Sequence, residues 1–191
     1  MKSMRSLIKA SAVIISLLMF IVFTGCSKQN KAIENEAASA EGFSGKGYSF
    51  SYDTEKWVDS TELNELAGTE YESTNYVDII LESAEYPGNF IIITNNDVGK
   101  KGLFMADEIG PTYEKSVASD DRVTYLGCKD VKVGGCSGVN VSISMDNSGK
   151  MDMLYFWHGT YQTMITYNVE SDLYDKLYPD LEQVLDTVDF D

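Results

Sequence analysis

The chain has 191 residues, is 43% hydrophobic and 12% aromatic, and carries 30 acidic against 15 basic residues, a formal charge of −15. The apolar content excludes a disordered chain, and the acid excess argues against nucleic acid as a partner, because phosphate binding needs clustered Lys and Arg. One histidine and three cysteines exclude most zinc sites and most histidine-based catalytic centres.

The N-terminal segment has the pattern of a targeting signal. Lys2, Arg5 and Lys9 are followed by an apolar run over residues 10–23, with no acidic residue. That run is about 14 residues long, short of the roughly 20 that a permanent membrane-spanning helix needs. A basic start before a short apolar run is typical of a secretory signal peptide, so we interpret residues 1–25 as one.

The run ends in Val22-Phe23-Thr24-Gly25-Cys26, which resembles the signal of bacterial lipoproteins, where a small residue precedes an invariant cysteine. The resemblance implies that the Cys26 sulfur receives a diacylglycerol and that cleavage makes Cys26 the first residue. The sequence departs from the family at Phe23, where leucine is usual. The alternative is an uncleaved signal anchor with an incidental cysteine. We predict a lipid anchor at Cys26 on the extracytoplasmic face of a bacterial membrane, where each buried methylene contributes about 0.8 kcal/mol.

Residues 26–42 comprise the lipidated cysteine and a predicted flexible tether, because the stretch is polar, small and free of aromatic side chains. Residues 43–191 are predicted to form one domain of ordinary size, without internal repeats or a Pro- or Gly-rich linker. Removal of the signal takes away three basic residues and leaves 12 basic and 30 acidic residues, a net charge of −18.

Strand patterns dominate the predicted domain. Apolar alternation and short apolar runs predict strands over residues 47–52, 77–81, 90–94, 123–133, 139–145, 151–157 and 161–169. Turn sequences such as Gly134-Gly135 and His158-Gly159-Thr160 separate the last four strands. We expect those four strands to form an antiparallel meander.

Two helical patterns lie between the strands. Residues 102–118 predict a helix that Pro111 kinks or restarts. Residues 60–67 predict a shorter helix, with Ser60 as its N-cap.

The C-terminal segment has the clearest helical period. Apolar residues recur there at spacings of three and four, at Leu173, Leu177, Leu181, Val184, Leu185 and Val188. Ser171 is a suitable N-cap, and Pro179 suits the first turn of a second helical piece better than a helix interior.

The opening strand over residues 47–53 with Trp57, the hairpin over residues 131–138 and the closing segment over residues 181–190 resemble the PsbP-like fold. This fold is shared by the photosystem oxygen-evolving accessory protein, a nuclear-transport Ran-binding factor and many bacterial lipoproteins. The family often has a proline before its tryptophan, and this chain has none there. The resemblance implies an α+β domain, an antiparallel β-sheet covered by helices (a PsbP-like α/β/α sandwich). It implies little about function, because the fold serves unrelated partners.

Several sequence motifs contain residues that could form chemical sites. His158 as a general base would need a nearby nucleophile or acid, and no spacing suggests one, so we interpret it as a turn residue. Residues 146–152 lack the ligands that a calcium loop needs at its fifth and twelfth positions. Residues 95–102 lack the glycine spacing and the Ser/Thr of a phosphate-binding loop. We therefore expect no metal site, no cofactor and no enzymatic activity.

Cys128 and Cys136 are candidates for a disulfide, because the chain is predicted to be exported. If Gly134-Gly135 is the turn, Cys128 lies near Val141, too far from Cys136 for the roughly 7 Å limit between disulfide-bonded Cα atoms. A bulge over residues 127–130 would fold the chain back and restore the pairing. The sequence leaves both outcomes open.

Residues 170–191 hold eight acids and one lysine. They could attract a cationic partner or divalent ions, but the acids lie opposite the leucines, which favours the solvated face of an amphipathic helix.

These observations lead to a functional hypothesis and an alternative. The first is a non-enzymatic, lipid-anchored extracytoplasmic domain that binds a protein or a cell-envelope component. The alternative is a small-ligand or metal-ion receptor serving a transporter, with an apolar pocket lined by tyrosines such as Tyr155 or Tyr167. An unrecognised hydrolase is a third, nominal hypothesis.

Overall fold

The computed structural model describes residues 40–63, 70–71, 75–99, 105–146 and 149–191, all of which belong to one unit of the chain. Its elements in chain order are β1 (Ala40–Gly45), β2 (Tyr48–Asp53), β3 (Trp57–Asp59), the 3-10 turn η1 (Thr61–Leu63), β4 (Glu70–Tyr71), β5 (Asn75–Ser83), β6 (Phe90–Asp97), α2 (Ala106–Val117), β7 (Val123–Val133), β8 (Cys136–Met145), β9 (Gly149–His158), β10 (Tyr161–Val169), α3 (Tyr174–Leu185) and β11 (Asp189–Phe190).

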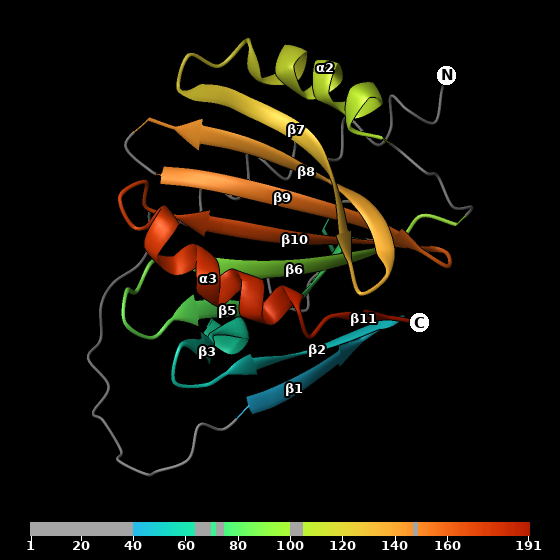
Figure 1. Ribbon diagram of the computed structural model, residues 1–191, viewed down its shortest axis with the longest axis vertical. Helices are drawn as coiled ribbons and strands as arrows, with labels where there is room; N and C mark the ends of the chain where they lie inside the picture. Colours follow the sequence, from blue (N-terminus) through green and yellow to red (C-terminus); the bar gives the residue numbers. More distant parts are fainter. Residues whose placement is uncertain (1–39, 64–69, 72–74, 100–104, 147–148) are drawn as a thin grey trace. The chain divides into compact units, whose positions relative to one another are not determined.

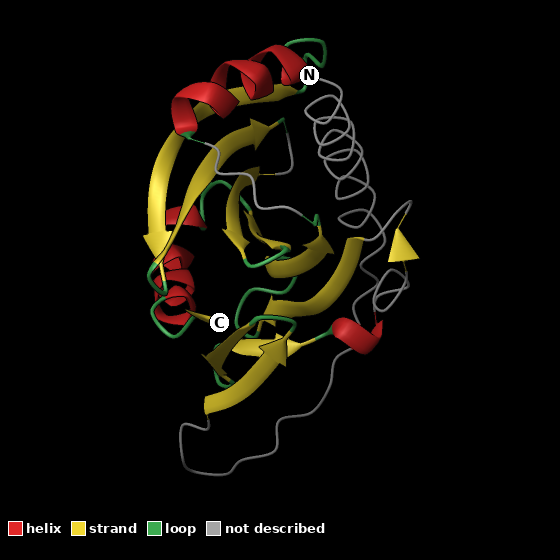
Figure 2. Ribbon diagram, turned by 90° about the vertical axis from the view of Figure 1, so that its right-hand side faces the viewer, coloured by secondary structure: helices red, strands yellow, loops and turns green. Residues whose placement is uncertain are grey.

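The larger sheet has the strand order β3-β5-β6-β10-β9-β8-β7, with β4 alongside β5, and neighbouring strands are antiparallel. Figure 1 shows α2 beside β7 at one end of this sheet and α3 crossing over β10, β6 and β5. Figure 2 shows the strands as curved ribbons, with α2 above and α3 to one side. The meander β7-β8-β9-β10 and the predicted α+β fold are therefore confirmed.

The turn between β7 and β8 confirms the predicted hairpin. Gly134 and Gly135 have φ values of +53° and +77°, the left-handed region that a tight two-residue hairpin turn requires. A Cβ atom on Gly134 would lie 2.4 Å from the carbonyl oxygen of Val188. Glycine is therefore needed here both for the turn and for its close approach to the chain after α3.

A smaller sheet has the order β1-β2-β11. Tyr48, Phe50 and Tyr52 alternate inward along β2, as the aromatic alternation predicted. β1 begins at Ala40, inside the segment predicted as a tether, because its backbone pairs with β2 and the Tyr52 hydroxyl donates to Glu41 at 3.1 Å. The first described strand therefore starts three residues before the predicted domain boundary at residue 43.

The helix α3 is continuous, contrary to the prediction that Pro179 restarts it. Proline removes one intrahelical hydrogen bond. The loss is tolerated because Leu177 and Leu181, on either side of the proline, are buried in the same core. Ser171 is not the N-cap; the helix begins after Leu173, whose carbonyl accepts from Leu177 N at 2.9 Å.

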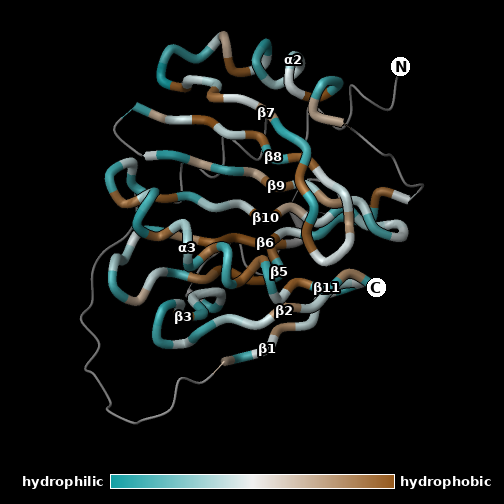
Figure 3. The backbone as a smooth tube through the Cα atoms, in the orientation of Figure 1, coloured by the Kyte–Doolittle hydropathy of each residue, from teal (hydrophilic) through white to brown (hydrophobic). Residues whose placement is uncertain are grey.

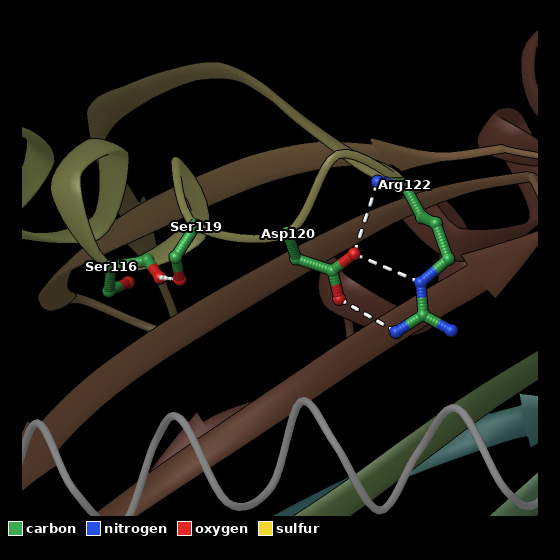
Figure 4. A network of polar contacts seen from close by, with 4 residues as sticks. All are labelled: Ser116, Ser119, Asp120 and Arg122. Atoms are coloured by element: carbon green, nitrogen blue, oxygen red, sulfur yellow. Dashed lines mark hydrogen bonds and ion pairs between the residues drawn. The ribbon is translucent and has the colours of Figure 1, made fainter.

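The helix α2 contains Pro111 in its interior and is followed by a short turn into β7. Figure 4 shows that turn: the Ser119 hydroxyl donates to the carbonyl of Ser116, and Asp120 accepts from Arg122. Arg122 donates from Nε at 2.9 Å and from Nη2 at 2.8 Å, and its backbone N–H donates to the same carboxylate. These bonds fix the direction in which the chain leaves α2.

The predicted helix over residues 60–67 is represented by η1 alone, since residues 64–69 lie outside the described ranges. Ser60 donates its hydroxyl to the carbonyl of Ile80 at 3.4 Å, while Asp59 accepts from Thr61 N at 2.8 Å. Asp59 therefore takes the role expected of Ser60. None of the helices in the described ranges is long and apolar enough to span a membrane.

Candidate functional site

Side chains alternate between the two faces of the larger sheet, and each face carries a different helix. We call the first the α3 face: Ile165 and Tyr167 of β10 share a core with Leu181 of α3. We call the opposite side the α2 face: Tyr113 of α2 packs against Tyr155 of β9, with ring centroids 6.1 Å apart and their hydroxyls hydrogen-bonded. Successive side chains of a strand point to opposite faces of the sheet, and paired residues on neighbouring strands share a face. The register therefore shows on which face each strand residue lies. Figure 3 shows hydrophobic stretches along the central strands β5 and β6.

Most buried polar groups on the α3 face have partners, with the Oδ1 of Asn140 and the Nε1 of Trp57 as exceptions. The carboxylate of Asp152, only 3% exposed, accepts from the Ser142 hydroxyl at 2.5 Å and from the Tyr174 hydroxyl. Burial and this hydrogen bond raise the pKa of Tyr174. The ammonium of Lys150 lies 4.4 Å from the centre of the Tyr174 ring. This cluster gives each carboxylate oxygen of the buried Asp152 a hydroxyl donor from a half-buried side chain.

His158 also lies on the α3 face and is buried, not placed in an open turn. Its Nε2 lies 2.7 Å from the Thr163 hydroxyl, which donates to Asn95 Oδ1 at 3.3 Å. The Asn95 amide donates in turn to the carbonyl of Lys46 at 3.0 Å. Because the Thr163 hydrogen is used on Asn95, the Nε2 of His158 donates to Thr163. The histidine therefore belongs to a chain of structural hydrogen bonds.

The α2 face is mostly apolar across the centre of the sheet. Its buried side chains include Ile80, Ile92, Met151, Met153, Tyr155, Trp157 and Met164. Tyr155 and Trp157 are stacked, with ring centroids 6.2 Å apart and planes inclined by 21°. The face thus combines a stacked aromatic pair with flexible methionines, all of them buried.

Four polar side chains interrupt this apolar face and have an oxygen without a hydrogen-bond partner. They are Thr94 and Asn96 of β6 and Thr166 and Asn168 of β10. Each is at most 7% exposed. An unpaired buried polar group costs about 1–3 kcal/mol, and most buried polar groups in proteins have a partner. The four oxygens mark this stripe as the candidate site.

The register places these four residues along two neighbouring strands. Thr94 lies opposite Met164, so Thr166 is its diagonal neighbour, about 7 Å away. Asn96 lies opposite Gln162, six residues before Asn168 along β10. The stripe therefore has a threonine pair at its centre and an asparagine towards each end.

This stripe was not predicted from the sequence, which indicated only that residues 90–94 and 161–169 are strands. The sequence signal for the stripe lies in β10, where the polar residues Gln162, Thr166 and Asn168 alternate with residues of the α3 face. Of the two tyrosines named for a ligand pocket, Tyr155 lies on the α2 face. Tyr167 lies on the α3 face, packed against Tyr174 with centroids 5.5 Å apart.

The two cysteines of the sheet domain are not joined to each other. Cys128 pairs in register with Val141, as the hairpin register predicted, and it faces Gly110 of α2. Cys136 is on the opposite face, and its thiol donates to the carbonyl of Trp157 at 3.4 Å. A bulge does occur beside Gly127, but it does not bring the sulfurs together. Burial raises the pKa of the Cys128 thiol.

Other predicted sites have plain structural roles or lie beyond the described residues. Cys26 and its flanking signal are among the latter, as are residues 100–102 of the loop compared with a phosphate-binding loop. The segment compared with a calcium loop joins β8 to β9, and Asn147 and Ser148 within it are not described. Within the described ranges, no three His, Cys, Asp or Glu side chains are grouped to hold a metal ion. Exposed acids of α3 form its solvated face.

The fold resembles that of PsbP. The solution structure of cyanobacterial PsbP (CyanoP) from Synechocystis sp. PCC 6803 is similar with a TM-score of 0.61 and 14% sequence identity, over 85% of this chain and 98% of that chain. A crystal structure from Bacteroides thetaiotaomicron has a TM-score of 0.39 and 11% identity, over 78% of this chain and 48% of that one. No protein-family model and no curated protein matches the sequence. The chain therefore has a PsbP-like α+β fold, and at this identity the similarity concerns the fold alone.

Proposed function

We propose that the protein is a lipid-anchored binding protein on the extracytoplasmic face of a bacterial membrane. The basic start, the short apolar run and Cys26 support the anchor, and Cys26 precedes Ala40 of β1 by 14 residues. The domain acts by binding, not by catalysis. His158, the sole histidine of the sequence, is engaged in a buried network with Thr163.

The ligand we propose is a small molecule bound on the α2 face. The observation that carries this proposal is the set of four buried oxygens without partners, on Thr94, Asn96, Thr166 and Asn168. A protein partner docks on exposed side chains, but these residues are at most 7% exposed. A partner for them must therefore be small enough to be enclosed.

The anchor is tested by growing cells with an alkyne-modified palmitate and measuring the intact mass of the membrane-extracted protein. The full chain should label and should have lost residues 1–25, whereas Cys26→Ser should do neither. Cys128→Ser is the matched control and should label normally. An unmodified, uncleaved N-terminus in the full chain would refute the anchor.

The ligand is tested by mass spectrometry of small molecules extracted from the purified full chain. A compound should co-purify with the wild type and be lost from Thr166→Trp, whose side chain fills the centre of the stripe. Lys129→Trp, at an exposed position of β7 opposite Asn140 and so on the other face, is the control and should retain the compound. Equal compound in all three proteins, or none in any, would contradict a small-molecule function and favour the protein partner.

A further inference from the structure

We infer that the α2 face binds an uncharged, elongated, largely apolar molecule that carries at least one O–H or N–H donor. This inference rests on the proposed function and specifies the chemistry of its ligand. It depends on three observations: the charge of the face, the identity of the unpaired atoms, and their spacing.

The central part of the α2 face is nearly free of charge. Across the described positions of β5, β6, β9 and β10, one charged side chain, Glu82, lies on this face. Its carboxylate accepts from the backbone N–H of Gly88 at 2.8 Å, so it is directed to the β5–β6 turn. Burying a charge without a charged partner costs far more than burying a neutral polar group. The face therefore selects against ions of either sign.

The unpaired atoms define the polar groups of the ligand. Asn96 and Asn168 each present an unpaired Oδ1, which can only accept a hydrogen bond. Thr94 and Thr166 each present a hydroxyl, which can donate or accept. A ligand with acceptors alone would leave the asparagine oxygens unpaired, so the complementary molecule has donors.

The spacing of these atoms defines the shape of the ligand. Six residues of β10 separate the position opposite Asn96 from Asn168, about 20 Å along an extended strand. Ile92 and Met164 lie between the polar positions, beside the stacked rings of β9. The molecule is therefore elongated and has an apolar body. Its hydrogen-bond donors lie beside the threonine pair or beside the asparagines at the two ends of the stripe.

Bound water is the competing explanation, because a water molecule can pair an isolated buried oxygen. The two explanations differ in what replacement of the threonines does. Valine has nearly the shape of threonine and lacks the hydroxyl. If water pairs the hydroxyls, valine leaves that water without a partner and lowers stability. If the hydroxyls await a ligand, valine removes an unpaired group and raises stability while weakening binding.

The experiment uses three probes with one carbon skeleton: N-phenyl-1-naphthylamine, its anionic 8-sulfonate, and 1-phenoxynaphthalene, in which oxygen replaces the N–H. Native mass spectrometry of the full chain in detergent counts bound probe directly. We expect the amine to bind at least about tenfold more tightly than the sulfonate. We also expect it to bind about two- to tenfold more tightly than the ether, which lacks the donor.

The variant Thr94→Val/Thr166→Val should lose the preference for the amine over the ether and should unfold at a higher temperature. Thr163→Val is the matched control, since Thr163 is a buried threonine of β10 on the other face. It should keep the preference and lose stability. If the double variant does not fold, the three probes on the wild type still decide charge and donor.

Each remaining result overturns the inference in a distinguishable way. Equal binding of amine and sulfonate would overturn the uncharged class and leave the proposed small-molecule function standing. Equal binding of amine and ether would overturn the donor. Loss of stability in the double variant would assign the oxygens to water. Binding of no probe would overturn the inference, while co-purification of a compound would still decide the proposed function.

Discussion

The two faces of the larger sheet use the same strands differently. Thr163 and Thr166 are both 0% exposed and three positions apart on β10, yet Thr163 is bonded to Asn95 and close to His158, while Thr166 has no partner. On the α3 face, Asp152, His158 and Thr163 are hydrogen-bonded, while Asn140 Oδ1 and Trp57 Nε1 have no partner. The α2 face leaves hydrogen-bonding capacity unused beside apolar side chains. Along β6 and β10, the unpaired side-chain oxygens therefore lie on the α2 face, and the proposed function assigns binding to that face.

The largest effect is expected in the core of the α3 face. Leu181→Ala removes a side chain that is 0% exposed and should lower the free energy of unfolding by about 3 kcal/mol. Urea unfolding followed by tryptophan fluorescence measures the loss. Leu185→Ala, at a half-buried position of the same helix, is the control and should lose less. A loss below about 1 kcal/mol for Leu181→Ala would show that α3 is not part of the stabilising core.

A paired substitution compares the faces directly. Thr163→Val should lower the free energy of unfolding by about 1–2 kcal/mol, because it deprives Asn95 and His158 of a partner. Thr166→Val should raise it by up to about 1 kcal/mol, because it removes an unpaired hydroxyl. Thermal and urea unfolding of both variants give the signs. Equal losses would mean that the faces do not differ as described.

A pH-dependent effect is expected where Tyr48 donates to Asp78 at 2.9 Å. Burial raises the pKa of Asp78, which the Tyr48 hydrogen bond and Lys46 partly offset. A raised carboxyl pKa contributes stability below the pKa of the unfolded chain and loses it as pH rises through the folded value. Asp78→Asn keeps an acceptor for Tyr48 and should gain stability relative to the wild type between pH 4 and pH 7. Unfolding midpoints at both pH values measure this gain, and a constant difference would contradict it.

The smallest effect is expected at the turn after α2. Hydrogen bonds from Arg122 lower the pKa of Asp120 to about 2. A lowered carboxyl pKa contributes stability above the pKa of the unfolded chain, and the contribution is lost as pH falls to about 2. Arg122→Ala should therefore differ from the wild type near pH 5 and converge with it near pH 2. Because the arginine is exposed, 0.5 M salt should shrink the difference, and a salt-independent difference would point to another cause.

Much of the fold was predictable from local patterns. The meander followed from turn residues such as Gly134-Gly135, and the helix stripe of Leu177, Leu181 and Val184 followed from spacing. Pro179 was misplaced because the penalty of a proline is local, whereas the burial that outweighs it comes from strands distant in sequence. The extension of β1 to Ala40 was missed for the same reason, since its pairing with β2 outweighs a weak strand propensity.

The candidate site was much less predictable. Tertiary contacts decide which side-chain oxygens lack hydrogen-bond partners. The sequence alone does not distinguish a threonine whose hydroxyl is bonded from one whose hydroxyl is not. Thr94 and Thr166 are about 70 residues apart and become neighbours only through the register of β6 and β10. His158 shows the converse, because its partners Thr163 and Asn95 are brought together by the same register. The sequence could therefore locate the strands without showing which buried side chains have partners.

The pairing of β1 with β2 has a mechanical consequence. A chain held at Cys26 would transmit tension to Ala40, at the open end of the β1–β2 hairpin and outside the larger sheet. Such a load separates the residue pairs one after another from Ala40–Asp53, which takes less force than shearing them all together. Release of the six residues of β1 would lengthen the connection by about 20 Å. The β1–β2 hairpin would thus open under tension before any load reaches the strands of the larger sheet.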